Sequence, residues 1–483
     1  MRGGHLRNGT NGEAANIHPL LRVDSDGDYM TDWMFDRIVD LSPKTLEPVP
    51  HLATSWDVSA DGKTYTFKFN NGVKWHDGQA FSASDVEYSL KRIQAADYTG
   101  PFKPQFKHVQ SVQTVDPLTL RINLSQPNAS FLAASMRELK PIPEHLVQDQ
   151  DLRTGAYATQ LIGTGPYKFV EWKKGSSFSF AVNENYWGGR PNIDQITHNV
   201  VTDMNSLVAS AEAGEIDFLI MPVPSELKRL QDEGKLNVTL LDPYIPESLY
   251  FNLTHPILKD VRVRQAIAQA LDMQAFTRDI MMGVVGPAKG VVMPYLWAYE
   301  PTATMPVFNL DKSKQLMADA GQASGFSIGL ASNQGNAFRE AFSTYAQAQL
   351  AKINVKVDIQ LNEWPVFLKR SQSFDFEMGT QAITAGYPDP DILSQAFQTN
   401  GLTNYMQYTG VDQLLDDARA AQDIAKRKEL YGQVQKKVAA DLPIFYTFYR
   451  PNPIVTTKKL NGLTPTALSP YYAIDKWWFA GQA

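Results

Sequence analysis

The sequence predicts an α/β protein with two or three domains. Its 483 residues are too many for one ordinary hydrophobic core, so we expect the chain to divide. Segments with strand-like alternation and segments with helical spacing follow one another, and Pro and Gly separate them. In the second half a helical segment leads directly into a strand, which is the order of a crossover unit on a sheet.

Antiparallel strands are predicted in the first half. Residues 64–69 alternate polar and apolar side chains, and Asp61-Gly62 just before them is a strong turn signal. Residues 118–124 alternate in the same way, with four aliphatic side chains on one face. This alternation indicates strands with one buried and one solvated face, as in antiparallel sheets.

Two helix starts are predicted in the same half. Ser84 is the predicted N-cap of a helix that runs to about Ile93, with Glu87 completing a capping box; Ser82 with Asp85 is the alternative. A second helix is predicted over residues 30–39, after an acidic loop at residues 24–28, because early Asp residues favour the helix dipole. That loop resembles a calcium site but lacks the Gly at its sixth position and the Glu at its twelfth.

The second half shows helices followed by a strand. Asp260 is the predicted cap of a helix whose buried face comprises Val263, Ile267, Ala270 and Leu271. A further helical stripe is formed by Phe338, Phe342, Tyr345, Gln349 and Leu350. Residues 355–361 then alternate with a period of two, which predicts a strand.

Composition excludes several classes of function. A net charge of −6 without basic clusters argues against a nucleic-acid surface. The absence of cysteine excludes disulfides and thiolate sites, and the eight scattered histidines show no zinc-binding spacing. Ser225 and Lys228 match a Ser-x-x-Lys pattern, but its companion motifs are absent. We therefore expect no enzyme activity, no metal and no cofactor, and we find no stretch long and apolar enough to span a membrane.

Motifs distributed along the whole chain resemble those of the family-5 extracellular solute-binding proteins of bacterial ABC importers, the peptide- and nickel-binding class. The first run is the most specific and covers residues 50–86. The matching segments are Pro50-His-Leu-Ala-Thr-Ser-Trp56, Asp61-Gly-Lys-Thr-Tyr-Thr-Phe-Lys-Phe69, Gly72-Val-Lys-Trp-His-Asp-Gly78, Phe81-Ser-Ala-Ser-Asp-Val86, Gly163-Thr-Gly-Pro-Tyr167, Asn185-Tyr-Trp-Gly-Gly-Arg-Pro191, Gly214-Glu-Ile-Asp217, Tyr250-Phe-Asn252, Asp260-Val-Arg-Val-Arg-Gln-Ala266 and Tyr387-Pro-Asp-Pro-Asp391. Most of these segments are interpreted as structural: residues 75–78 as a turn and residues 260–264 as a helix start with surface arginines.

The resemblance implies a two-lobed, periplasmic-binding-protein-like α/β fold of class II, in the large cluster with an extra subdomain. The larger lobe is expected at residues 1–245 plus 451–483, with the subdomain at about 50–165, and the smaller lobe at 246–450. A hinge would let the lobes close over a ligand. The implied partners are a peptide or small-molecule ligand and the permease subunits of an importer. We expect a monomer outside the cytoplasm, whose signal segment and any lipid-bearing Cys are missing from this sequence.

In peptide-binding relatives, the stretch before an Asp-Pro pair lines the cleft, and an Asp there holds the α-ammonium of the peptide. A buried ammonium needs such a partner. Counting back from Asp389-Pro390, that position is Gly386. The ligand-lining candidates of this stretch are Ile383, Thr384, Ala385, Gly386, Tyr387 and Asp389.

Because Gly386 carries no carboxylate, the identity of the ligand is not fixed by this position. There are three explanations: another acid holds the ammonium, the alignment slips by a residue or two, or the ligand has no ammonium at that point. The leading hypothesis is an oligopeptide or dipeptide receptor, and the alternative is a receptor for an oligosaccharide, an opine or a metal chelate. The resemblance places further candidate ligand contacts at Arg22, Asp24, Tyr29, Met136, Arg137, Tyr295 and Trp297.

Overall fold

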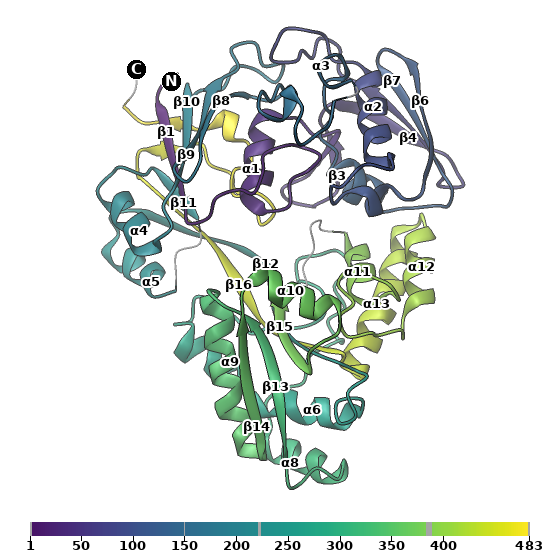
Figure 1. Ribbon diagram of the computed structural model, residues 1–483, viewed down its shortest axis with the longest axis vertical. Helices are drawn as coiled ribbons and strands as arrows, with labels where there is room; N and C mark the ends of the chain where they lie inside the picture. The colour runs from purple at the N-terminus through teal and green to yellow at the C-terminus, as the bar shows by residue number, and fades with distance from the viewer. Residues whose placement is uncertain (1, 149, 221–223, 383–388, 482–483) are drawn as a thin grey trace. The chain divides into compact units, whose positions relative to one another are not determined.

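The computed structural model describes residues 2–148, 150–220, 224–382 and 389–481 (Figure 1). The chain forms two compact units, and each is described by itself. Unit 1 comprises residues 1–241 and 452–483, and unit 2 comprises residues 242–451. The chain leaves unit 1 within strand β12 (Asn237–Phe251) and returns within strand β16 (Ile444–Thr456).

The main sheet of unit 1 combines parallel and antiparallel strands in the order β16-β11-β1-β10-β9-β8. Strand β1 (His5–Thr10) runs parallel to both of its neighbours, β10 (Gln195–Val200) and β11 (Phe218–Ile220). Strands β8 (Tyr167–Lys173) and β9 (Ser177–Val182) continue the sheet as an antiparallel hairpin. The returning strand β16 pairs antiparallel with β11.

A second sheet in unit 1 is fully antiparallel, with the order β4-β5-β7-β6. Its strands are β4 (Ala53–Val58), β5 (Thr64–Phe69), β6 (Val109–Asp116) and β7 (Thr119–Leu124). Tyr65 lies opposite Ile122 and Phe67 opposite Leu120, and all four are buried. The predicted antiparallel strands are therefore confirmed. Their buried side chains belong to the same core cluster as Trp33 and Trp477.

Helix α2 (Ala83–Gln94) packs on strands β6 and β7 of this sheet (Figure 1). The first choice of its cap, Ser84, is wrong and the alternative is correct. The Asp85 carboxylate accepts the backbone N–H of Ser82 at 2.9 Å. Glu87 is engaged elsewhere, since it accepts the N–H of Thr114 at 2.6 Å.

Helix α1 (Ser25–Met34) begins earlier than predicted. The Asp24 carboxylate accepts the N–H of Gly27 at 2.7 Å, so the acidic segment forms the first turn of the helix and not a loop before it. Phe35 is extended, and the carbonyl of Met34 accepts the N–H of Gly165 at 2.8 Å. A Cβ on Gly165 would lie 2.5 Å from the Met34 carbonyl carbon, so only glycine allows this approach.

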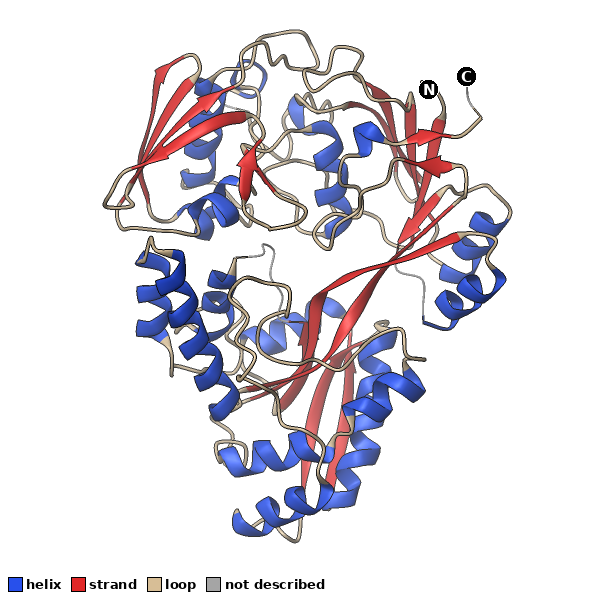
Figure 2. Ribbon diagram, turned by 180° about the vertical axis from the view of Figure 1, so that it is seen from behind, coloured by secondary structure: helices blue, strands red, loops and turns tan. Residues whose placement is uncertain are grey.

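The sheet of unit 2 has the order β14-β13-β15-β12-β16. Strand β13 (Phe326–Asn333) is parallel to β14 (Val355–Asn362) and to β15 (Met378–Ala382). Helix α9 (Ala337–Leu350) connects β13 to β14, which confirms the predicted crossover unit. In Figure 2 the strands of this sheet are red and the helices beside them are blue.

Helix α6 (Val261–Ala270) of unit 2 has the predicted cap and the predicted buried face. Asp260 accepts the N–H of Arg262 at 2.9 Å, and the four apolar residues of the face are at most 1% exposed. The expectation of two surface arginines is wrong for Arg264. That side chain is buried and donates to the carbonyls of Leu258 and Leu442, at 2.6 and 2.9 Å.

The remaining elements are short strands and peripheral helices. In unit 1 they are β2 (Val39–Leu41), β3 (Pro48–Pro50), α3 (Glu144–Val147), α4 (Met204–Glu212), α5 (Pro224–Glu233), β17 (Leu460–Asn461) and β18 (Trp478–Phe479). In unit 2 they are α7 (Met273–Ala275), α8 (Leu310–Asp319), α10 (Trp364–Gln372), α11 (Leu393–Phe397), α12 (Asp412–Ala420) and α13 (Ile424–Asp441). None of the described helices is long and apolar enough to cross a membrane.

Candidate functional site

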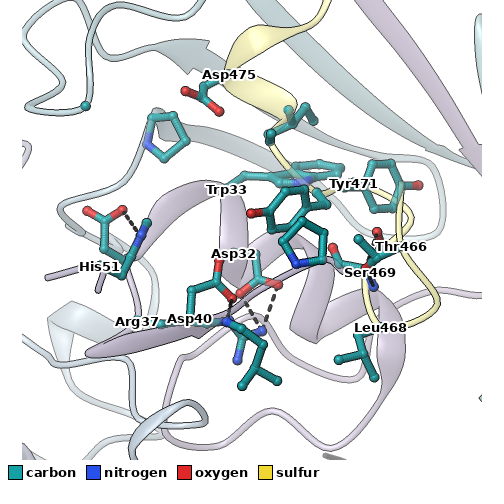
Figure 3. Close-up of a pocket in the computed structure, with 18 of the residues that line it drawn as sticks. Asp32, Trp33, Arg37, Asp40, His51, Thr466, Leu468, Ser469, Tyr471 and Asp475 are labelled. Carbon is teal, nitrogen blue, oxygen red and sulfur yellow. Dashed lines mark hydrogen bonds and ion pairs between the residues drawn. The ribbon is translucent and has the colours of Figure 1, made fainter. Parts of the chain in front are cut away.

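A cavity of ≈ 280 Å³ in unit 1 is the candidate site (Figure 3). It is enclosed by the end of helix α1, the segment that follows it up to His51, the turn at residues 186–188 and the segment 466–475. Arg137 completes the wall. The cavity therefore joins the two chain segments of unit 1, which are far apart in sequence.

Aromatic side chains form one wall of the cavity. Trp33 is fully buried, and its ring meets that of Tyr471 edge-on with centroids 5.1 Å apart. Tyr186 and Trp187 contribute rings from the turn before strand β10, and Tyr472 contributes one from the segment after strand β17. Such rings provide apolar area together with a face that attracts cations.

The carboxylate of Asp36 binds both rings of the aromatic turn and also His51. Its carboxylate accepts hydrogen bonds from Tyr186 Oη and Trp187 Nε1, both at 2.8 Å, and from His51 Nε2 at 3.0 Å. Burial by itself raises the pKa of Asp36, but the hydrogen bonds, led by that from His51, outweigh it and lower the pKa. Asp36 is thus a structural anion that holds the wall in place.

A network of buried charges forms part of the cavity wall, because Asp32 and Arg37 both line the cavity. Lys140 Nζ is fully buried and contacts the carboxylates of Asp28 and Asp32 at 2.8 and 2.7 Å. Arg37 binds Asp32 at 2.7 Å, as the dashed lines in Figure 3 show. Burial lowers the pKa of Lys140 to about 8, and the nearby Arg22 adds to that effect. Each charge in this network has an opposite partner, which is the condition for burying it.

Arg137 belongs to the same network and also lines the cavity. Its Nη1 donates to Glu138 at 2.6 Å, and Glu138 also binds Arg22 at 2.9 Å. Arg137 Nε is buried and has no hydrogen-bond partner among the described residues. The guanidinium therefore retains donor capacity beside the cavity.

Two carboxylates at the cavity are less constrained. Asp40 is half-buried, and its Oδ1 accepts the N–H of the following residue, Leu41, at 2.8 Å. Within the described part of the chain Asp40 forms no ion pair. Asp475 pairs with Lys476 at 2.8 Å. Burial raises the pKa of Tyr472, and the charges of Asp40 and Asp475 raise it further, so both carboxylates lie near that phenol. This side of the cavity favours a cationic group.

Of the site residues predicted in unit 1, only Arg137 lines the cavity. Arg22 is buried in its ion pairs and Asp24 caps helix α1. Tyr29 packs against Tyr471 with ring centroids 5.2 Å apart, and Met136 is fully buried. None of these four residues lines the cavity.

Five of the predicted site residues of unit 2, Ile383, Thr384, Ala385, Gly386 and Tyr387, lie outside the described residues. Asp389 is buried, with Arg427 Nη2 at 2.8 Å. The Arg427 guanidinium lies 5.2 Å over the ring of Trp297. Tyr295 is half-buried two residues earlier. Asp389 is therefore already engaged in an ion pair with Arg427.

Sequence reasoning missed most of the cavity. Tyr186 and Trp187 lie in a segment that matched the family pattern, and that match was the available signal for them. Asp36 lies within the helix predicted over residues 30–39, whereas helix α1 in fact ends at Met34. Asp40, Tyr471, Tyr472 and Asp475 carry no recognisable motif. Their proximity arises from folding alone.

The fold and the site define a ligand-binding protein with two α/β units connected by two strands. Its cavity offers aromatic rings, a guanidinium and carboxylates, and no group of three or more potential metal ligands occurs among the described residues. The profile of the family "Bacterial extracellular solute-binding proteins, family 5 Middle" matches residues 47–405. The chain belongs to this family.

Individual relatives match nearly the whole chain. Oligopeptide-binding protein AppA of Bacillus subtilis is 28% identical and covers 99% of this chain and 92% of its own length. Dipeptide-binding protein of Escherichia coli is 29% identical, with coverages of 83% and 81%. The solved structure of the Bacillus subtilis AppA in complex with a nonapeptide superposes with a TM-score of 0.87, at 26% identity, over 99% of both chains. The α/β fold of the peptide-binding members is thereby confirmed.

Proposed function

We propose that this chain captures an oligopeptide or dipeptide outside the cytoplasm and delivers it to the permease of an ABC importer. The observation that carries this proposal is the agreement with an oligopeptide-binding protein over 99% of the chain, both in sequence and in fold. The chain acts as a monomer and binds its ligand without transforming it.

The cavity of unit 1 suits the charged end of a peptide. A free peptide carries an α-ammonium, and Gly386 provides no acid for it. Asp40 is a carboxylate without an ion-pair partner among the described residues, and the rings of Tyr186 and Tyr472 line the same cavity. A ligand ammonium at Asp40 would form a charge-assisted hydrogen bond and approach an aromatic face. We assign this role to Asp40.

The Ser-x-x-Lys motif at Ser225 and Lys228 does not support a hydrolase function. Ser225 and Lys228 lie on helix α5, where both are exposed. Lys228 Nζ forms an ion pair with Asp232 at 2.5 Å, one helical turn away. A general base needs to be held near the nucleophile and poised to take its proton, and this lysine is instead a surface cation.

A thermal-shift assay with peptides tests the function. Ligand that binds only the folded state stabilises it by mass action, by about 2.7 kcal/mol at a concentration of 100 times Kd. We expect peptides with a free amino terminus to raise the melting temperature, and the same peptides with an acetylated amino terminus to have little effect. No stabilisation by any free-amino-terminus peptide would contradict peptide capture.

The role of Asp40 is tested by substitution. Asp40→Asn removes the charge and keeps the shape, so we expect peptide affinity to fall roughly tenfold, the usual scale of a charge-assisted hydrogen bond. Asp97→Asn, at an exposed acid of the same unit, is the matched control and should bind as the parent does. Native mass spectrometry of the purified protein adds an independent result. A co-purified oligosaccharide, opine or metal chelate would replace the peptide as the ligand.

A further inference from the structure

A second cavity in unit 1 shares no lining residue with the candidate site. Its volume is ≈ 480 Å³, within the range of small-molecule sites. It is enclosed by the loop before helix α1, the segment 152–161, and strand β8 with the turn that follows it. Its apolar lining residues are Ile17, Leu21, Leu152, Ala158, Leu161, Phe169 and Val170.

His18 brings a buried hydrogen-bond donor to this cavity. The side chain is 4% exposed, and its Nδ1 accepts the N–H of Leu20 at 3.1 Å. Burial lowers the pKa of His18 to about 3, and the charge of Arg153 contributes, so the ring is neutral. Its single proton is then on Nε2, because Nδ1 acts as the acceptor.

The Nε2–H group of His18 has no hydrogen-bond partner among the described residues. A buried donor without an acceptor is costly, and a ligand acceptor in the cavity would remove that cost. The loop backbone occupies the Nδ1 side of the ring, and Tyr157 meets the ring edge-on with centroids 5.7 Å apart. The position of the donor is therefore fixed before any ligand binds.

Arg153 supplies a positive charge on the same side. It donates from Nε to Thr99 Oγ1 at 2.9 Å and forms no ion pair within the described part of the chain. Its charge lowers the pKa of His18, which places the guanidinium near the imidazole.

The other charges at the cavity are engaged by neighbours. Glu171 pairs with Lys173 at 3.4 Å, and Lys174 lies 5.5 Å over the ring of Trp172. Glu13, next to the lining, accepts from Trp172 Nε1 at 2.8 Å. Neither Arg153 nor Lys174 forms an ion pair within the described part of the chain, so the uncompensated charge at the cavity is positive.

We propose that this cavity binds a carboxylate attached to an apolar chain. The carboxylate accepts the Nε2–H of His18 and pairs with Arg153, and the chain lies against Leu161 and Phe169. This site is separate from the proposed peptide site and does not depend on it. Two sources share the chemistry: a free medium-chain fatty acid, and the carboxyl-terminal apolar residue of a peptide.

Isothermal titration calorimetry with four probes tests the proposal. Octanoate represents the fatty acid and N-acetyl-L-leucine represents the end of a peptide, and the tighter binder identifies the source. Octan-1-ol has the chain without the charge, and octylamine has the opposite charge. We expect at least one acid to bind, octan-1-ol to bind roughly tenfold more weakly, and octylamine to give no binding.

Two variants and one control test whether the acid binds in this cavity. Arg153→Gln, at an exposed side chain, should weaken the acid roughly tenfold, while Arg278→Gln in unit 2, whose side chain is 71% exposed, should have no effect. His18→Asn keeps an acceptor for the N–H of Leu20 and removes Nε2, so it should also weaken binding. Absence of heat with both acids would overturn the proposal. So would octan-1-ol binding as tightly as octanoate, with Arg153→Gln unchanged.

Discussion

At the scale of single residues, His51 and Asp36 of unit 1 form a close pair, with His51 Nε2 3.0 Å from Asp36 Oδ1, and each residue shifts the pKa of the other. The pKa of His51 is raised, because the hydrogen bond and charge of Asp36 outweigh the burial that lowers it. The pKa of Asp36 is lowered by the same contact, against its own burial. The pair joins the loop before strand β4 to the aromatic turn of the cavity.

The pair predicts a pH-dependent stability. A raised histidine pKa stabilises the fold below its unfolded value of 6.5, and that contribution is lost as pH rises through the folded pKa. A lowered aspartate pKa contributes above 3.8 and is lost as pH falls through its folded pKa. We therefore expect His51→Gln to reduce the free energy of unfolding most between about pH 4 and 6.5, and least above about pH 8.

Urea denaturation at about pH 5.5 and 8.5 measures this difference. In an Asp36→Asn background the His51→Gln substitution should show a weaker dependence on pH, because Asp36 raises the pKa of His51 more than the charge of Asp40 does. An equal loss of stability at both pH values in the parent background would show that the pair acts by shape and not by charge.

Three residues show which features of the site and the core could be predicted from the sequence and which could not. Arg137 was identified from its resemblance to relatives, and it does line the cavity. Asp40 was not, because one Asp among 51 acidic residues carries no signal until its neighbours are known. Arg264 was expected at the surface because arginines usually are, yet it is buried and donates to the carbonyl of Leu442, just after helix α13, and to that of Leu258.

At the scale of elements, helix α2 shows how tertiary contacts choose between equivalent local signals. Ser82 with Asp85 and Ser84 with Glu87 fit the same capping pattern. Asp85 also accepts the N–H of Glu144 at 3.0 Å and the indole N–H of Trp75 at 3.3 Å. These donors are remote in sequence, so the sequence alone left both starts open.

Asp85 is predicted to matter more than an ordinary cap. Asp85→Ala leaves three donors without their acceptor, and we expect a loss of about 2–4 kcal/mol in the free energy of unfolding. Ser84→Ala is the matched control and should cost less than about 0.5 kcal/mol. Chemical denaturation followed by circular dichroism measures both. An equal loss in the free energy of unfolding for both substitutions would contradict a special role of Asp85 in capping helix α2.

At the scale of the whole molecule, most of the architecture followed from the sequence. Alternation at residues 64–69 and 118–124 and the helix–strand order at residues 338–361 identified strands and a crossover unit that the structure confirms. Local pattern is sufficient there, because each element buries one face. The cavity was not predictable in this way, since it joins Asp40 with Tyr472 and depends on the path of the whole chain.

The two connecting strands lead to a prediction about ligand response. Because strands β12 and β16 are the only covalent connections between the units, we expect a bound peptide to change the arrangement of the units by a hinge motion. Small-angle X-ray scattering should show a smaller radius of gyration with a binding peptide than without it. The acetylated peptide serves as the control. An unchanged radius at saturation would contradict closure.

The path of the chain also sets an order for its synthesis. Unit 2 is one continuous segment, residues 242–451, whereas unit 1 requires residues 452–483. Those residues supply Tyr471 and Trp477, whose rings pack against Phe218 with centroids 4.8 and 5.1 Å away. A nascent chain therefore holds every residue of unit 2 while unit 1, begun first, still lacks part of its core. Of the two units, unit 1 is therefore translated first and completed last. Until residues 452–483 are made, it exposes apolar surface to which a chaperone would bind.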